Sequence, residues 1–256
     1  MTMATALITG ASAGLGLEFA WQLATARHDL VLVARDEARL EETARQIRAA
    51  AGVRVQVLCA DLSVPDDVAR VAERLATTGS PDERPVGLLV NNAGFATHQH
   101  FVGGDLDVEL EALDVMVRAV MVLSHAAAGQ MTERGRGAIL NVASVAALTA
   151  GGTYAAAKAW VRSFTEGLAV ELHGTGVTAT VLCPGFTHTE FHDRAGIDKS
   201  VLPDLAWLDA DRVVAEALAD VRRGVVISTP SVRYRVASAA LRAMPRSAVR
   251  AIGKYR

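Results

Sequence analysis

Tyr154 and Lys158 stand four residues apart in the stretch GGTYAAAKAW (residues 151–160), with only alanines between them. Alanine is the strongest helix former, so the stretch is expected to be helical, and two residues four positions apart then share one face. A cation beside a phenol stabilises the phenolate and lowers the tyrosine pKa from its ordinary value of about 10. The pair could therefore move a proton near neutral pH. The alternative is a chance pair on a solvated helix face.

Three glycines mark a second candidate site, in the stretch TGASAGLG (residues 9–16). Glycines let a backbone turn tightly and let a phosphate approach it, and the helix that follows offers free N–H groups to an anion. The spacing differs from the commoner fingerprint G-x-G-x-x-G, and such turns also occur for steric reasons alone. Its place between a predicted strand and a predicted helix favours a dinucleotide site. The predicted contacts are Gly10, Ser12, Ala13, Gly14, Leu15 and Gly16.

An arginine follows the second predicted strand, in the sequence Ala34-Arg35-Asp36. A site specific for NAD usually carries an acidic residue at this strand end, which binds the ribose 2′-hydroxyl, whereas a nearby arginine suits a 2′-phosphate. Ala34 stands where the acid is expected. The pattern favours NADP(H), and NAD(H) remains possible. The alternative is that Arg35 is a surface residue, while Asp36 caps the next helix.

Small or polar residues also follow the other predicted strands. Asp61 could hold the adenine edge or form a turn, and Asn92 with Gly94 could leave room for a ribose or serve the geometry of their own turn. Hydroxyl groups after the sixth strand could reach a nicotinamide amide. These strand-end candidates are Asp61, Leu62, Asn92, Ala93, Gly94, Ser144, Pro184, Gly185, Thr187 and Thr189.

Short apolar runs alternate with longer amphipathic stretches along the 256-residue chain. Continuous Val/Leu/Ile runs are typical of parallel strands that are covered on both faces. The alternation predicts an α/β fold with a doubly wound, mostly parallel Rossmann-type sheet in a single domain, residues 1–256. Such sheets bind ligands beyond the carboxyl ends of their strands, where the candidates above would meet. We expect strands at 4–9, 29–34, 53–59, 86–91, 137–143 and 177–183, and helices at 15–27, 36–50, 65–77, 107–134 and 154–173.

Composition excludes several other classes of protein. A net charge of −2 gives no reason to expect a nucleic-acid partner. Cys59 and Cys183 are expected to be buried free thiols in a reducing compartment, and His98 with His100 lacks a third ligand, so we expect no metal. The chain enters a strand-like run at once and has no run of eighteen uncharged apolar residues. These features predict a cytoplasmic protein without a signal peptide or membrane span.

The motifs TGxxxGxG, NNAG, Ser144, YxxxK and PG stand in the order and at the spacing of the short-chain dehydrogenase/reductase family, which residues 4 to about 190 resemble. The chain looks most like members that reduce ketones or β-oxoacyl compounds with NADPH. The resemblance implies hydride transfer between NADP(H) and a carbonyl or secondary alcohol. It makes Tyr154 the acid/base residue and Ser144 the donor to the carbonyl oxygen. Lys158 would lower the tyrosine pKa and bind the nicotinamide ribose.

The strand-end rule places the substrate pocket at the loops 95–104 and 186–206, the second of which we expect to be the substrate loop. Both loops carry aromatic residues, which suggests an apolar small-molecule carbonyl compound as the partner. The candidate pocket residues are Phe95, Phe101, Phe186 and Phe191.

Met116 departs from the family pattern. Members usually carry an asparagine midway along the fourth helix, and aligning LDVMVRAV puts Met116 there. In the family that asparagine helps to hold a water between the lysine and solvent, whereas methionine cannot donate a hydrogen bond. One outcome is a working enzyme with a damaged proton relay. The other is a catalytically weak dinucleotide-binding sensor or scaffold; the intact Ser144, Tyr154 and Lys158 favour the enzyme.

Two long helices carry a prediction about quaternary structure. Members of the family commonly pair their fourth and fifth long helices between subunits, here residues 107–134 and 154–173. Small side chains on these segments permit close approach, so we expect a homodimer or homotetramer. The small residues are Ala119, Ala126, Ala127, Ala128, Ala155 and Ala159.

The C-terminal segment, residues 222–256, is basic. No acidic residue follows Asp220, so residues 1–220 carry −11 and the segment carries +9. From Ser231 onward an apolar stripe could lie on an anionic membrane, where each cation contributes about 1 kcal/mol. The stripe is mostly alanine and Pro245 interrupts it. These features favour packing of the stripe on the domain, where the arginines would balance the negative charge of residues 1–220. The stripe consists of Val232, Val236, Ala239, Ala240 and Ala243.

Overall fold

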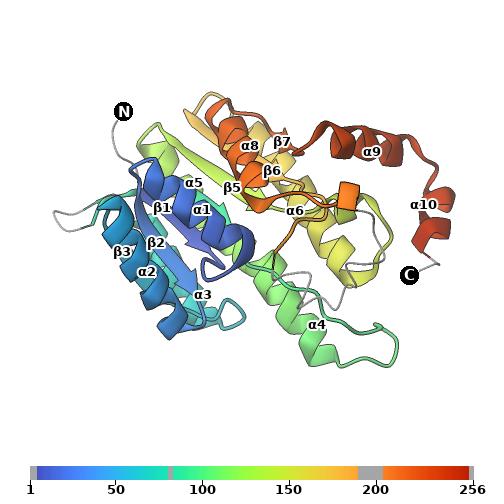
Figure 1. The fold of residues 1–256 in the computed structure, drawn as a ribbon, viewed down its shortest axis with the longest axis horizontal. Coiled ribbons are helices and arrows are strands. Elements are labelled where there is room, and N and C mark those ends of the chain that lie inside the picture. Colours follow the sequence, from blue (N-terminus) through green and yellow to red (C-terminus); the bar gives the residue numbers. More distant parts are fainter. Residues whose placement is uncertain (1–4, 80–82, 190–203, 254–256) are drawn as a thin grey trace.

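The computed structural model describes residues 5–79, 83–189 and 204–253, which surround a seven-stranded parallel sheet (Figure 1). The strand order is β3-β2-β1-β4-β5-β6-β7, so the order reverses between β1 and β4. The predicted fold class is therefore confirmed, and a ligand site is expected at this reversal. The strands are β1 (Thr5–Thr9), β2 (Asp29–Ala34), β3 (Val55–Cys59), β4 (Val86–Asn91), β5 (Gly137–Val142), β6 (Val177–Leu182) and β7 (Ile227–Ser228).

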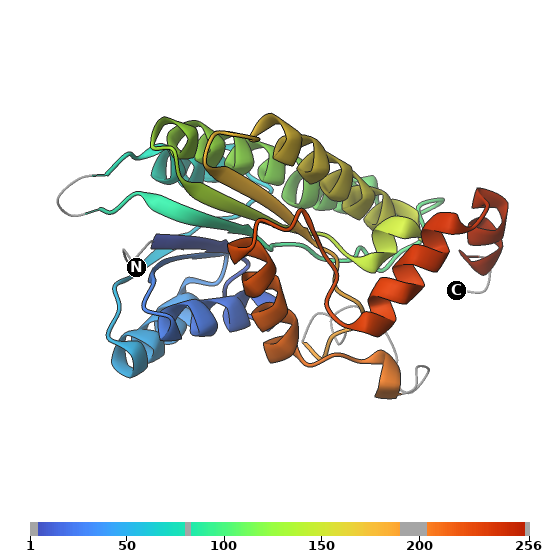
Figure 2. The same ribbon diagram turned by 90° about the horizontal axis from the view of Figure 1, so that it is seen from above.

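Helices cover both faces of the sheet (Figure 2). Successive strand residues point to opposite faces, so Ile8 of β1 lies in one core and Leu7 in the other. The core around Ile8 includes Phe19 of α1, and the core around Leu7 includes Leu123 of α5. The first face is covered by α1 (Gly14–Thr25), α2 (Glu37–Ala51) and α8 (Ala210–Arg222), and the second by α3 (Pro65–Ala76), α5 (Ala119–Glu133) and α6 (Gly152–Glu171).

Several elements differ from the prediction, among them α8, which was not expected. The strand β7 was not expected because it has only two residues, too few for a sequence pattern; its pairing is extended by the Cys183 N–H, which donates to the Ser228 carbonyl at 2.8 Å. The helix expected at 107–134 is divided into α4 (Leu106–Leu113), a π-helical turn (Asp114–Arg118) and α5. Met116 lies in the π-helical turn, a type of distortion often found at functional sites.

The two cysteines differ in burial. Cys183 is buried as expected, whereas Cys59 is only half-buried, because it ends β3, the edge strand of the sheet. Both are free thiols. Within the described ranges, no helix combines the length and the apolar character needed to cross a bilayer.

The C-terminal helices α9 (Val232–Ala243) and α10 (Arg246–Gly253) lie beyond β7, away from the strands that begin the sheet (Figure 1). The expectation that the apolar stripe packs on the domain is wrong: Val232 and Val236 are each 64% exposed. The helix instead turns Tyr234, Ser238 and Leu241 toward the body, because the Tyr234 phenol has hydrogen-bond partners there. Of the basic residues of the segment, Lys254 and Arg256 lie outside the described residues.

Candidate active site

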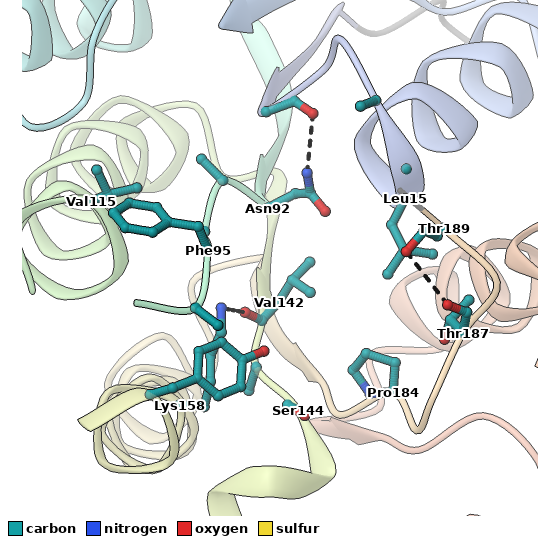
Figure 3. A pocket seen from close by; sticks show the side chains of 18 of the residues that line it. Leu15, Asn92, Phe95, Val115, Val142, Ser144, Lys158, Pro184, Thr187 and Thr189 are labelled. Atoms are coloured by element: carbon teal, nitrogen blue, oxygen red, sulfur yellow. Dashed lines mark hydrogen bonds between the residues drawn. The ribbon is translucent and has the colours of Figure 1, made fainter. Parts of the chain in front are cut away.

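A cavity of about 730 Å³ runs along the carboxyl ends of the strands (Figure 3). Its lining comes from the ends of β1 to β6 and from α9, which are far apart in the sequence. The predicted cofactor-binding residues line it, with Gly16 as the exception. Those in the lining are Gly10, Ser12, Ala13, Gly14, Leu15, Arg35, Asp61, Leu62, Asn92, Ala93, Gly94, Tyr154, Lys158, Pro184, Gly185, Thr187 and Thr189.

The glycine turn needs glycine for two different reasons. Gly10 and Gly14 have φ angles of 65° and 54°, in the left-handed region that side chains disfavour. A Cβ on Gly16 would lie 2.1 Å from the Gly10 carbonyl oxygen and 2.5 Å from Asn92 Nδ2. Gly16 therefore lets α1 pack against the turn and, unlike the other predicted cofactor contacts, does not line the cavity.

The first turn of α1 borders the cavity and has no side-chain cap. Ala13 occupies the N-cap position without a side-chain hydrogen bond, and the first turn has no acidic residue. By contrast, α2 is capped as predicted, since Asp36 Oδ1 accepts a hydrogen bond from the Arg39 N–H at 2.9 Å. An uncapped helix N-terminus with its positive dipole end at a cavity suits an anion such as a pyrophosphate.

Asn92 links the end of β4 to the end of β1 by hydrogen bonds. Its Nδ2 donates to the Thr9 carbonyl at 2.9 Å, and its N–H donates to Thr9 Oγ1, also at 2.9 Å. The Ala93 N–H reaches the same hydroxyl at 3.0 Å. The two strands at the order reversal are thus held together by side-chain bonds, which explains Asn92 without a ligand contact. The residue still borders the cavity (Figure 3).

Arg35 lies at the end of β2 and is 63% exposed. Its Nη1 lies 3.1 Å from Glu111 Oε1 of α4 and 3.7 Å from Asp61 Oδ2. Asp61 also forms a turn, since Oδ1 accepts from the Ser63 N–H and hydroxyl at 2.9 and 2.7 Å. Both alternatives for Asp61 thus have support: it makes a turn and it borders the cavity.

Two charged residues near Arg35 were missed by the sequence analysis. Arg39, in the first turn of α2, also lines the cavity. The sequence could have indicated Arg39, because it is a second arginine four residues after Arg35, on the helix that Asp36 caps. Glu111 had no local signal, because only the tertiary structure brings α4 to the end of β2.

Ser144, Tyr154 and Lys158 meet at the opposite end of the cavity. Ser144 follows β5 and begins a short 3₁₀ turn, where its Oγ accepts from the Ala146 N–H at 3.1 Å. Its side chain also hydrogen-bonds that of Tyr154. Lys158 Nζ donates to the Val142 carbonyl at 2.9 Å (Figure 3) and lies 5.7 Å from the centre of the Tyr154 ring.

Burial controls the titration of both groups. It raises the pKa of Tyr154 to about 12, against the hydrogen bond from Ser144, and it lowers the pKa of Lys158 to about 8. The net shift of the tyrosine pKa is therefore upward, against the expected lowering. The physical reason is that burial penalises the phenolate more than its hydrogen bond stabilises it. At neutral pH Tyr154 is a protonated phenol and Lys158 is mostly an ammonium.

Met116 is only 2% exposed and lies beside Lys158. A Cβ on Gly94 would be 3.2 Å from Lys158 Nζ, 3.3 Å from Met116 Cγ and 3.4 Å from Met116 Sδ. The absence of a Cβ on Gly94 thus leaves room for both the amine and the thioether. The thioether offers no hydrogen-bond donor to this space.

Apolar side chains surround the Tyr154 end of the cavity, among them Phe95, Val115 and Phe186. Leu241 of α9 completes this wall and was not predicted, because it is 87 residues from Tyr154 in the sequence. Phe101 is 65% exposed and is not in the lining, which corrects its prediction: the loop carries it outward ahead of α4. Phe191 lies outside the described residues.

The two histidines of the loop 95–104 differ in their position relative to the cavity. His98 borders the cavity, whereas His100 does not. Within the described residues, no group of three or more His, Cys, Asp or Glu side chains is arranged to hold a metal ion.

Comparisons with known proteins agree with this geometry. Residues 4–199 match the family model for short chain dehydrogenase. The chain is 31% identical to the ketoacyl reductase HetN of Nostoc sp. over 224 residues, which is 85% of this chain and 75% of that protein. A short-chain dehydrogenase from Sphingobium yanoikuyae, solved in complex with NADPH, is 36% identical, with a TM-score of 0.84 over 94% of this chain and 92% of that one.

A second solved structure, the bulky-bulky ketone specific alcohol dehydrogenase from Comamonas testosteroni, is 30% identical, with a TM-score of 0.80 over 94% of this chain and 93% of that one. The family model spans the sheet from β1 through β6 together with the residues at each strand end. The chain belongs to the short-chain dehydrogenase family and is an oxidoreductase of the NAD(P)-dependent type.

Proposed function

We propose that the chain is an NADPH-dependent reductase of apolar carbonyl compounds, with Ser144, Tyr154 and Lys158 as its catalytic residues. One observation carries the proposal: a single cavity joins the uncapped N-terminus of α1 to these three side chains. The relative from Sphingobium yanoikuyae, solved with NADPH, supports the choice of cofactor.

The lining fits a dinucleotide with a 2′-phosphate. The glycine turn and the first N–H groups of α1 suit the pyrophosphate. Arg35 and Arg39 bring two guanidinium groups to the end of β2, where a 2′-phosphate would lie. Beyond Asn92, the small residues Ala93 and Gly94 leave space along the cavity toward Lys158.

A bound nicotinamide would supply the hydride. The protein's part is to hold the carbonyl and to provide the proton. Ser144 donates a hydrogen bond that fixes the direction of the carbonyl oxygen, and the protonated Tyr154 gives its phenolic proton to that oxygen. Lys158, charged at neutral pH, stabilises the phenolate that Tyr154 leaves behind.

The apolar wall supports the proposed substrate class. Phe95, Val115, Phe186 and Leu241 border the cavity near Tyr154, and no carboxylate or guanidinium lines this end among the described residues. A bulky or aromatic ketone, or an oxoacyl chain, would gain from burial here at about 25 cal/mol per Å². A small anionic carbonyl compound would find no guanidinium among the described residues at this end.

The direct test is NADPH oxidation over a panel of aryl ketones, oxoacyl thioesters and small anionic aldehydes. Tyr154→Phe keeps the ring and removes the proton, so we expect turnover to fall by about 10²–10⁴-fold. NADPH binding, followed by its own fluorescence, should change little and shows that the variant is folded. Equal turnover in the variant would contradict the role of Tyr154. Tight NADPH binding without turnover of any compound would favour the sensor alternative.

We further propose that the chain forms a homo-oligomer through the outer faces of α5 and α6. Val170 is 76% exposed, and Trp160 and Phe164 stack at 4.8 Å beside a shallow hollow on α6. Three of the alanines expected at the interface, Ala119, Ala127 and Ala155, instead lie in the subunit core, because they point toward the sheet.

Light scattering at micromolar concentration should therefore give the mass of a dimer or tetramer. Val170→Glu should shift that mass toward the monomer, since it would bury an unpaired charge in the interface. A monomeric mass for the wild type would contradict the proposal.

A further inference from the structure

The phenol of Tyr234 on α9 holds together two segments that are distant in sequence. Its Oη donates to the Ala206 carbonyl at 2.6 Å and accepts from the Phe186 N–H at 3.1 Å. Its ring lies against the backbone of Gly185, where a Cβ would come within 2.1–2.3 Å of the ring carbons. One side chain thus contacts the chain just after β6 and just before α8.

These two segments also bind each other. The Leu208 N–H donates to the Phe186 carbonyl at 2.8 Å, and the His188 N–H donates to the Leu208 carbonyl at 2.9 Å. The rings of His188 and Trp207 stack with their centres 5.1 Å apart. Residues 185–188 and 206–208 therefore form one unit, and Tyr234 joins this unit to α9.

The same unit reaches the glycine turn at the other end of the cavity. Its continuation, Thr189, lies 3.4 Å from the position of a Cβ on Gly14, and Thr189 Oγ1 donates to the Thr187 carbonyl at 3.4 Å (Figure 3). Thr187 and Thr189 both line the cavity. The segment held by Tyr234 is thus the wall that faces the first turn of α1.

We infer that Tyr234 is a positioning residue that sets the affinity for the dinucleotide by fixing the wall formed by residues 184–189. The inference rests on the proposed function, because it takes NADPH as the ligand of the cavity. Tyr234 itself is absent from the lining, so it acts through Gly185 and Phe186. Leu241, two turns further along the same face of α9, reaches the cavity directly.

The inference also explains why residue 185 is a glycine. Its φ angle is not among the positive ones, so backbone geometry does not require glycine there. The Tyr234 ring requires a glycine at residue 185, because any Cβ there would overlap the ring. The alternative is that the glycine leaves room for the ligand in the cavity, and the two explanations predict opposite results for a double variant.

Tyr234→Phe provides the first test, since it keeps the ring on Gly185 and removes both hydrogen bonds. We expect the Kd for NADPH, measured by its fluorescence, to rise about tenfold, the equivalent of one or two such bonds. Val232→Ala, on the exposed face of the same helix, is the matched control and should bind as the wild type does. A lower Tm for Tyr234→Phe with an unchanged Kd would overturn the inference, because it would mean that Tyr234 serves only the fold.

The second test compares Gly185→Ala with the double variant Gly185→Ala/Tyr234→Ala. The single variant should bind NADPH at least tenfold more weakly or fail to fold, and the double variant should recover folding and the affinity of Tyr234→Ala alone. Equal loss in both backgrounds would overturn the inference and assign Gly185 to the ligand. Absence of NADPH binding by the wild type would instead contradict the proposed function, so the two failures are distinguishable.

Discussion

The two ends of the cavity are built in different ways. At one end, the glycine turn is made within eight consecutive residues, TGASAGLG, where Gly10 and Gly14 adopt left-handed backbone angles and Gly16 lets the helix pack against the turn. The Tyr154 end is made by side chains from several segments that are distant in the sequence, from Phe95 to Leu241. The first end depends on local backbone geometry and the second on contacts between distant segments.

Charge differs between the ends as well. Arg35 is exposed and shares its guanidinium with two carboxylates, whereas Lys158 is buried and bonds a main-chain carbonyl. Solvent screens the first and burial shifts the pKa of the second. Substitutions at the two ends should therefore have different effects on stability and on ligand binding.

Gly16→Ala should have the largest effect, because the new Cβ would meet backbone atoms that cannot move away as a flexible side chain can. The overlap with the Gly10 carbonyl oxygen, at 2.1 Å, should lower the free energy of unfolding by about 1–3 kcal/mol. It should also weaken NADPH binding, since it displaces the turn. Urea unfolding and NADPH fluorescence measure the two effects.

Gly129→Ala is the matched control for this prediction. Gly129 lies in α5, and a Cβ there would have no atom within 4 Å. The substitution should raise the free energy of unfolding by about 0.5–1 kcal/mol, because alanine is the better helix former. A Gly16→Ala variant as stable as Gly129→Ala would show that the glycine turn is not locally constrained.

Arg35→Ala should come next in size. It should weaken NADPH binding by about 1.5–3 kcal/mol, the range for hydrogen bonds to charged groups, and change NADH binding little. Isothermal titration with both dinucleotides gives the two values. Equal loss for both would remove Arg35 from the recognition of a 2′-phosphate.

Glu111→Gln should change the affinity for NADPH in the opposite direction to Arg35→Ala. It removes a carboxylate that lies 3.1 Å from Arg35 and should tighten NADPH binding by about 0.2–1 kcal/mol, the usual value of an exposed ion pair. Weaker binding would mean that Glu111 positions Arg35 for the ligand and does not compete with it.

The effect of Lys158 on stability can be measured as a dependence on pH. Its folded pKa of about 8 is below the ordinary value of 10.5, so between these values the unfolded chain binds more protons than the folded one. The contribution of Lys158 to stability therefore rises as the pH rises from 8 toward 10. Tyr154, with its pKa raised to about 12, acts in the opposite sense only above pH 10.

Urea unfolding of the wild type and of Lys158→Met at pH 8 and pH 10 tests this sign. The wild type should gain stability relative to the variant at the higher pH, because methionine does not titrate. A difference that stays constant, or that shrinks, would show that burial does not lower the pKa of Lys158.

Local patterns of sequence determined the six longer strands, the glycine turn and the Tyr154–Lys158 pair. Apolar runs indicate buried strands, and glycines indicate positions with unusual backbone angles. An interval of four residues in a helix puts two side chains on one face. Each of these signals depends on neighbours in the chain, so it could be read without the tertiary structure.

Only the tertiary structure decided which way the Tyr154 pKa moves, what Arg35 contacts and which face of α9 is buried. The protonated state of Tyr154 depends on burial by segments that pack around it, and the partner of Arg35, Glu111, arrives on α4 from 76 residues away. Helix α9 turns Tyr234, Ser238 and Leu241 toward the body in place of the predicted apolar stripe, because the partners of the phenol, Phe186 and Ala206, lie there. Desolvation and hydrogen bonding depend on distances in space, and a single sequence does not contain those distances.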